Sequence, residues 1–180
     1  GFTYREDAPL DMRMDQEVLL TAADIVNTAS VQDLETIISD YGEERWARRI
    51  ARRIAQERQE APILTTGRLV QVILASIPAG AAAHDGPHPA RRTFQALRIA
   101  VNDELGSVRR GTAGAVRAAA RGARIVALSY HSLEDRIVKE LFRAKERPCS
   151  CPPSLPACVC GSRKALEVAT RRPIRPSEDE

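Results

Sequence analysis

The sequence lacks several features that would place it in common functional classes. It has no apolar run of about eighteen residues, and residues 1–7 are too polar for a secretory signal, so we expect a cytoplasmic protein without a membrane partner. With three Phe, three Tyr and one Trp, it is poorly equipped to stack single-stranded bases on aromatic rings. Its ten glycines never form a G-x-G pattern, so it does not contain the Gly-rich turn that opens a Rossmann-type sheet.

The two ends of the sequence also differ from those of a complete protein. The chain opens on Gly1 without an initiator methionine, and it stops shortly after a strand-like piece. We therefore expect these 180 residues to be a fragment of a longer protein.

Lysine is scarce, and arginine supplies most of the positive charge. The formal net charge is only +3, but arginines concentrate in a predicted helix over residues 43–59, whose apolar stripe contains Trp46, Ile50 and Ile54. Guanidinium groups bind phosphate oxygens bidentately, so this helix is a candidate nucleic-acid surface. The alternative is a solvated basic face balanced by neighbouring glutamates. The arginines of this segment are Arg45, Arg48, Arg49, Arg52, Arg53 and Arg58.

Residues 19–78 have the pattern of a compact unit of four helices. A Ser or Thr followed three residues later by Asp predicts the start of the first two helices, and Gly42 and Pro78 are expected to end the second and the fourth. Residues 80–89, rich in Ala, Gly, Pro and His, are expected to form a connection. The predicted starts are Thr21, Ser30, Glu43 and Thr66.

The second half of the sequence favours α/β architecture. Helices are predicted over 90–105 and 107–120, a buried strand over 124–128, another helix from Ser132, and a weaker strand over 165–170. Two strands are too few for a doubly wound sheet, so we expect further strands outside this sequence.

Ionisable residues crowd together just after the predicted strand 124–128. Ligands of open α/β sheets bind at the carboxyl ends of strands, which makes His131 a candidate to orient a substrate or to accept a proton. The alternative is that Ser132 and Asp135 only cap a helix, and that Glu134 and Arg136 are only surface charges.

Four cysteines form two C-x-C pairs within a proline-rich loop over 148–161. They suit a structural zinc site, but C-x-C is less diagnostic than C-x-x-C and no histidine is nearby. Reduced thiols without a metal are the main alternative, and a catalytic thiol is disfavoured. We therefore assign no metal ligand from the sequence. The pairs are Cys149 with Cys151 and Cys158 with Cys160.

Several long strings resemble one bacterial family, the small-subunit ribosomal RNA cytosine-N4 methyltransferases of type H, in order along nearly the whole chain. Small departures from the family pattern are Ala8 for a usual Gly, Tyr130 for a usual Phe, and Arg121-Gly122-Ala123 for a Gly-Gly turn. The matching strings are Pro9–Asp15, Asn27–Ser30, Tyr41–Arg45, Arg92–Leu105 and His131–Arg136.

The resemblance implies an α/β fold: part of a Rossmann-like S-adenosylmethionine-dependent methyltransferase with an inserted all-helical domain. It implies that 1–18 is a loop of the methyltransferase domain, that 19–88 is the inserted RNA-recognition domain, and that 89–180 is the C-terminal part of the methyltransferase domain. The family's cofactor residues precede the segment that matches Gly1, so none is assigned here and we expect the isolated chain to be inactive.

The resemblance also implies the reaction, which is methylation of the exocyclic N4 of a cytosine near the decoding site of 16S ribosomal RNA. The partner would be this RNA or the small ribosomal subunit; a homodimer, the choice of cytosine and a separate chain supplying the cofactor half remain open. A noncatalytic RNA-binding module is the alternative function. Candidate catalytic residues are Asp11, Asp15, His131, Glu134 and Asp135. Candidate substrate-binding residues are Arg13, Arg45, Arg48, Arg49, Arg52, Arg53, Arg92, Arg98, Asn102, Ser132 and Arg136.

Overall fold

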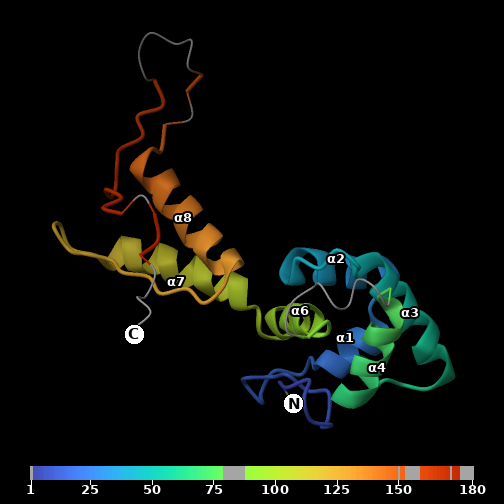
Figure 1. Cartoon of the computed structure of the whole chain (residues 1–180). Coiled ribbons are helices and arrows are strands. Elements are labelled where there is room, and N and C mark those ends of the chain that lie inside the picture. Colours follow the sequence, from blue (N-terminus) through green and yellow to red (C-terminus); the bar gives the residue numbers. More distant parts are fainter. Residues whose placement is uncertain (1, 79–87, 150, 153–158, 171, 175–180) are drawn as a thin grey trace. The chain divides into compact units, whose positions relative to one another are not determined.

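The computed structural model describes residues 2–78, 88–149, 151–152, 159–170 and 172–174 (Figure 1). The chain divides into two compact units, Gly1–Glu104 and Leu105–Glu180. The first unit contains α1 (Ala22–Thr28), α2 (Val31–Gly42), α3 (Ala47–Glu60), α4 (Thr66–Ser76) and α6 (Arg91–Asn102). The second contains α8 (Ser132–Glu146) and nearly all of α7 (Glu104–Ala118). No helix in these described ranges is long and apolar enough to span a bilayer.

The first two helices begin where their capping residues predict. The Thr21 hydroxyl accepts a hydrogen bond from the backbone N–H of Asp24 at 3.1 Å, and the Asp24 carboxylate accepts one from the backbone N–H of Thr21 at 2.8 Å. Ser30 caps α2 by accepting from the N–H of Asp33 at 3.1 Å. Both predictions are confirmed, because a cap depends only on residues one helical turn apart.

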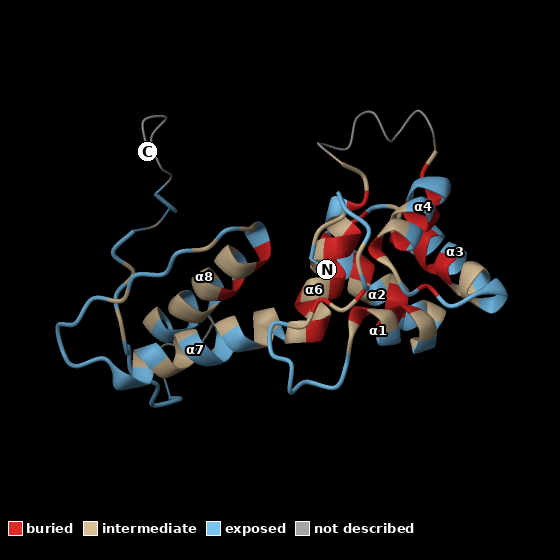
Figure 2. Ribbon diagram, turned by 90° about the horizontal axis from the view of Figure 1, so that it is seen from below, coloured by how far each residue is buried: buried red, intermediate tan, exposed pale blue. Residues whose placement is uncertain are grey.

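The apolar stripes of the first unit meet in one hydrophobic core. Helix α2 packs against α3 and α6, α3 packs against α4, and α1 contacts α3 and α6. In Figure 2 the buried residues concentrate on these helices. Among the described residues, Leu133 and Ile137 are the only buried apolar side chains of the second unit. The first unit therefore has a core of its own, whereas the described residues of the second bury little apolar surface.

Gly42 ends α2 and also lies where another helix comes close. Helix α2 ends at Gly42, as predicted, and the left-handed conformation that follows belongs to Glu43, with φ 48°. A Cβ at Gly42 would lie only 2.7 Å from the backbone oxygen of Arg92 in α6. The glycine therefore permits close contact between α2 and α6.

The predicted strands are not formed in the part of the chain that the structure describes, which contains no sheet. Residues 124–128 belong to no helix or strand, and Val126 and Leu128 are 92% and 79% exposed. Residues 165–170 also form no strand; they run beside the end of α8, where the N–H of Ala165 donates to the oxygen of Lys145. A strand requires a partner for its backbone groups. The Rossmann-like sheet therefore stays a prediction.

The boundary between the predicted helices 90–105 and 107–120 is shifted. Helix α6 ends at Asn102 because Asp103 is left-handed, with φ 46°, and α7 begins at Glu104. Helix α6 packs against α2 within the first compact unit, although the sequence placed it after the predicted domain boundary at residue 88. That boundary refers to a longer enzyme and stays a prediction.

Candidate functional site

Within the first unit, backbone hydrogen bonds tie the loop before α1 to Leu64 and to the start of α1. The N–H of Leu10 donates to the oxygen of Leu64 at 2.9 Å. The N–H groups of Ala22 and Ala23, in the first turn of α1, donate to the oxygens of Asp11 and Leu10 at 2.7 and 2.8 Å. The loop thus satisfies N–H groups that a helix leaves unpaired at its start, and the position of Asp11 is fixed by the fold.

Met12 and Asn102 hold the centre of this loop. Met12 has φ 65°, which is unusual for a residue other than glycine, and its side chain is 1% exposed in the core. The Asn102 amide donates to the oxygen of Met12 and to that of Arg98, both at 2.8 Å, while its oxygen accepts from the N–H of Met14 at 2.7 Å. Asn102 therefore ties the end of α6 to a loop 90 residues earlier.

Asp11 and Arg13 form a bidentate ion pair on this fixed loop. The Nε and Nη2 groups of Arg13 donate to the two carboxylate oxygens of Asp11, each at 2.8 Å, and the backbone N–H of Arg13 adds a third bond at 3.0 Å. These hydrogen bonds from Arg13 lower the pKa of Asp11 to about 2. Asp11 is thus an anion with little tendency to take up a proton near neutral pH.

The remaining donors of Arg13 are directed at its own loop. Nη1 donates to the backbone oxygen of Val18 at 2.9 Å and to that of Gln16 at 3.3 Å. The structure therefore places Arg13 as a brace between Asp11 and residues 16–18. Asp15 does not join this pair: it is exposed, and one of its carboxylate oxygens accepts from the N–H of Glu17 at 2.9 Å.

The two candidate arginines of α6 have different surroundings. The Nε and Nη2 groups of Arg98 donate to both carboxylate oxygens of Glu104, at 2.7 and 3.0 Å. Glu104 is thus a charged partner that the sequence analysis missed. The two residues are six positions apart and α6 ends between them, so no helical spacing pattern predicts the pair. Arg92 is half-buried, and its backbone oxygen faces Gly42.

The arginines of α3, together with Arg45 just before it, have three kinds of surroundings. The guanidinium carbons of Arg45 and Arg49 lie 5.1 and 5.6 Å from the ring centre of Trp46, within range of cation–π attraction. Arg53 pairs with Glu57 at 2.7 Å, as the balanced-face alternative anticipates. Arg48 and Arg52 are exposed. A shallow depression on this face is lined by Arg49, Arg52, Arg53, Gln56, Ala75 and Ser76.

Arg58, which belongs to the same helix, has a structural role. Its Nη1 donates to the backbone oxygens of Val26 and Ala29, at 2.9 and 2.8 Å. These carbonyl groups lie at the end of α1, where the helix dipole favours a positive charge. The arginine-rich segment therefore combines a solvent-facing surface with one residue that joins α3 to α1.

His131 and Glu134 lie together at the start of α8. His131 is the N-cap residue, one position before the Ser132 cap that the sequence predicted, and its side chain makes no capping bond. Glu134 accepts from the backbone N–H of Tyr130 at 2.8 Å, and its other oxygen lies 3.6 Å from Nε2 of His131. Both ring nitrogens of His131 are buried and have no hydrogen-bond partner among the described residues.

The other candidate residues of α8 are Ser132, Asp135 and Arg136. Asp135 pairs with Lys139 one turn later, at 2.8 Å, and Ser132 and Arg136 are exposed. A buried polar group without a partner is uncommon in folded proteins. His131 is therefore the candidate residue whose hydrogen-bonding capacity is most clearly left for a ligand.

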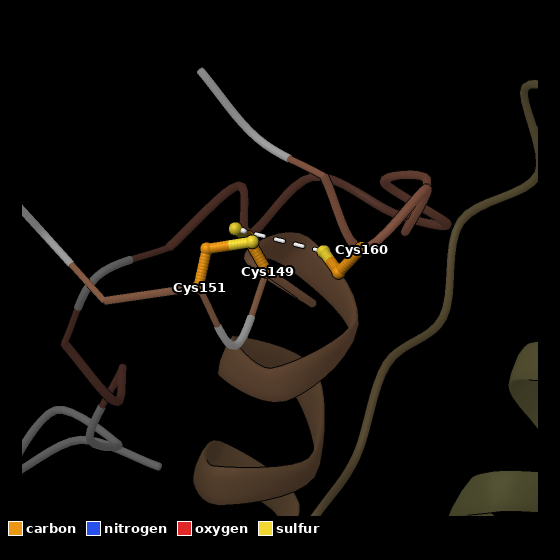
Figure 3. Close-up of side chains that lie close together, drawn as sticks. All are labelled: Cys149, Cys151 and Cys160. Carbon is orange, nitrogen blue, oxygen red and sulfur yellow. Dashed lines mark hydrogen bonds between the residues drawn. The ribbon is translucent and has the colours of Figure 1, made fainter. Parts of the chain in front are cut away.

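Three of the four cysteines gather after α8 (Figure 3). The sulfur atoms of Cys149, Cys151 and Cys160 all lie within 4.8 Å of one another. Cys158, the fourth, lies outside the described residues.

Comparison with known proteins gives consistent matches. The model of the MraW methylase family matches residues 1–180. The ribosomal RNA small subunit methyltransferase H of Symbiobacterium thermophilum is 55% identical over 177 residues, which cover 98% of this chain and 55% of the relative. The proteins of the same name from Heliobacterium modesticaldum and Brevibacillus brevis are 52% and 50% identical, each over 100% of this chain and 57% of the relative. The chain thus spans little more than half the length of these curated relatives.

Proposed function

Because this chain belongs to the MraW methylase family, we propose that it is part of a cytoplasmic enzyme that methylates the exocyclic N4 of a cytosine in small-subunit ribosomal RNA. The observation that carries the proposal is the match over residues 1–180, together with relatives that are 50–55% identical and named as methyltransferases of this RNA. Nothing in the described residues supports a homodimer.

S-adenosylmethionine is the methyl donor that this family membership implies. The residues of this chain do not fit a site for it, since the sequence has no Gly-rich turn and no sheet is present in the described residues to position one. We propose that residues outside this chain bind the donor, and that 124–128 forms a strand of a Rossmann-like sheet in the complete enzyme. The exposure of Val126 and Leu128 supports this, because a partner strand and a covering helix would bury them.

The residues of this chain would act on the base. The N4 amine is a poor nucleophile because its lone pair is delocalised into the ring, so an acceptor for its hydrogen bond and its proton is needed. We assign that role to His131, whose ring nitrogens are buried and have no partner among the described residues. Glu134, 3.6 Å from Nε2, would orient the ring. Asp135, paired with Lys139, is a weaker candidate.

We assign Asp11 and Arg13 to positioning of the loop. Arg13 engages both oxygens of Asp11, and the pKa of Asp11 is lowered to about 2, so this carboxylate is a poor proton acceptor. Its lone pairs outside the ion pair remain suited to accept a hydrogen bond from an amine. Asp15, which lies apart on the same loop, would contact the substrate only after the loop binds RNA.

A hybrid enzyme tests the proposal. This chain replaces the matching part of the Symbiobacterium thermophilum relative, and transfer of a labelled methyl group to unmodified small ribosomal subunits is measured. We expect activity, with a loss of about 100-fold or more in kcat for His131→Ala and no loss for the neighbouring exposed Tyr130→Phe. A folded hybrid that is inactive while the relative is active would contradict the function. Equal activities of the two variants would contradict only the role of His131.

For the chain by itself, one observation favours RNA binding without catalysis. The first unit has its own core and carries the exposed Arg48 and Arg52. We expect the 180-residue chain to bind small-subunit RNA with an affinity that falls steeply with salt, and to give no calorimetric signal with S-adenosylmethionine. Clear binding of the donor would show that the chain holds more of the cofactor site than we propose.

A further inference from the structure

We propose that Cys149, Cys151 and Cys160 form a structural zinc site that holds the segment after α8 against the end of this helix. The sequence left zinc as an open alternative for the cysteine-rich loop. The structure adds that three thiol groups from two separate stretches of that loop converge (Figure 3). Cys158 lies outside the described residues, and the proposal rests on the other three.

The spacing of the sulfur atoms fits a tetrahedral zinc site. Zinc binds thiolate at about 2.3 Å, so two thiolates on one tetrahedral ion lie about 3.8 Å apart. The sulfur atoms of Cys149 and Cys160 are 3.8 Å apart, and all three lie within 4.8 Å of one another. The other two sulfur–sulfur distances therefore need to shorten by at most about 1 Å for all three thiolates to bind a single ion.

The backbone around the cysteines brings the two stretches together. Helix α8 ends at Glu146, three residues before Cys149. Beyond the loop, the N–H of Ala165 donates to the oxygen of Lys145 at 3.0 Å, and the N–H of Val168 donates to the Glu146 carboxylate at 2.9 Å. The base of the loop is thus closed independently of any metal, which lowers the entropy cost of assembling the ligands.

Gly161 and Ser162, which follow Cys160, support the same site. Gly161 has φ 63°, and a Cβ added there would meet no described atom within 4 Å, so backbone conformation and not lack of space favours glycine at this position. The Ser162 hydroxyl lies 3.3 Å from the sulfur of Cys160. If Cys160 is a metal-bound thiolate, this hydroxyl donates a hydrogen bond to it and fixes its orientation.

A zinc ion would supply stability that this unit otherwise lacks. Only Leu133 and Ile137 are buried apolar side chains among its described residues, and domains with small cores commonly depend on metals or disulfides. A disulfide is the competing outcome, since sulfur atoms this close also meet the distance requirement for oxidation after small movements.

Metal analysis of the whole chain, purified anaerobically without a histidine tag, tests the site. We expect one zinc per chain, loss of stoichiometric zinc in Cys149→Ser, Cys151→Ser and Cys160→Ser, and full zinc in Val159→Ser, which places the same serine next to a ligand. Ser162→Ala should weaken zinc binding by about tenfold. When cobalt replaces zinc, the absorption spectrum should show the bands of a tetrahedral cobalt site and thiolate charge-transfer bands. This measurement uses the wild-type chain and needs no variant.

Several results would overturn the proposal. These are substoichiometric zinc in the wild-type chain, zinc retained by all three cysteine variants, or a thiol count that reveals a disulfide among these cysteines in the anaerobic protein. Circular dichroism of each variant shows whether its helices remain folded, and the first unit, which has its own core, should keep its helical signal in all of them.

Discussion

Removing the Asn102 side chain should detach the loop around Asp11 from α6. Asn102 accepts from the N–H of Met14 at 2.7 Å and donates to the oxygens of Met12 and Arg98 at 2.8 Å each. In Asn102→Ala all three bonds are lost, and the left-handed conformation of Met12 loses the contact that holds it.

The expected cost follows from these three bonds. A typical hydrogen bond contributes about 1 kcal/mol net, and Asn102 is only partly buried, so water replaces some of the lost partners. We expect about 2 kcal/mol of destabilisation, or about 10 °C in the midpoint of a unit of this size. Asn102→Asp keeps the acceptor for Met14 but turns a carboxylate oxygen toward two carbonyl oxygens, so it should cost at least as much.

Urea unfolding of the whole chain, followed by circular dichroism, gives the free energy, and hydrogen exchange at the Met14 amide reports on the loop. Gln95→Ala is the matched control, because Gln95 lies on the same helix and makes one long bond, 3.3 Å to the oxygen of Tyr41. It should cost under about 0.5 kcal/mol. If Asn102→Ala costs no more than this control and the exchange of the Met14 amide is unchanged, Asn102 does not hold the loop.

Three further predictions follow from other contacts. Because the pKa of Asp11 is lowered from 3.8 to about 2, its ion pair with Arg13 stabilises the fold above about pH 4, and this contribution is lost as the pH falls toward 2. After allowance for solvent exposure we expect a contribution of about 1 kcal/mol. In Asp11→Asn the free energy of unfolding should therefore fall less steeply on acidification. Gly42→Ala should destabilise by about 1–3 kcal/mol in thermal melts, since its Cβ would meet a backbone oxygen of α6 at 2.7 Å. Arg58→Ala should lower the free energy of unfolding by about 1–3 kcal/mol, because it removes two hydrogen bonds to the end of α1. Arg52→Ala, at an exposed position, should leave stability unchanged but weaken RNA binding in filter assays.

Local features of the fold could be predicted from the sequence. The caps at Thr21 and Ser30 were placed correctly because each depends on a residue three positions away. The stripe Trp46, Ile50 and Ile54 gave α3 and its inward face, and Ile50 and Ile54 are fully buried. The loop before α1 was also expected to be irregular, as it is.

Features that depend on distant partners could not be predicted. The bonds of Asn102 to Met12 and Met14 join residues about ninety positions apart, so no pattern in either segment reveals them. Gly42 ends α2 as predicted, but the close approach of α6 could not be foreseen from its neighbours in the sequence. The strand over 124–128 was predicted from composition alone, but pairing requires a second strand, which the described residues do not provide.

The chemical identity of the methylated nucleoside tests the central claim most directly. Small ribosomal subunits modified by the hybrid enzyme would be digested to nucleosides and analysed by chromatography with mass spectrometry. We predict N4-methylcytidine, formed about 100-fold or more slowly when His131→Ala replaces the wild-type chain. Methylation of the same RNA at cytosine C5, or on another base, would contradict the assignment of N4 as the acceptor and of His131 as the group that receives its proton.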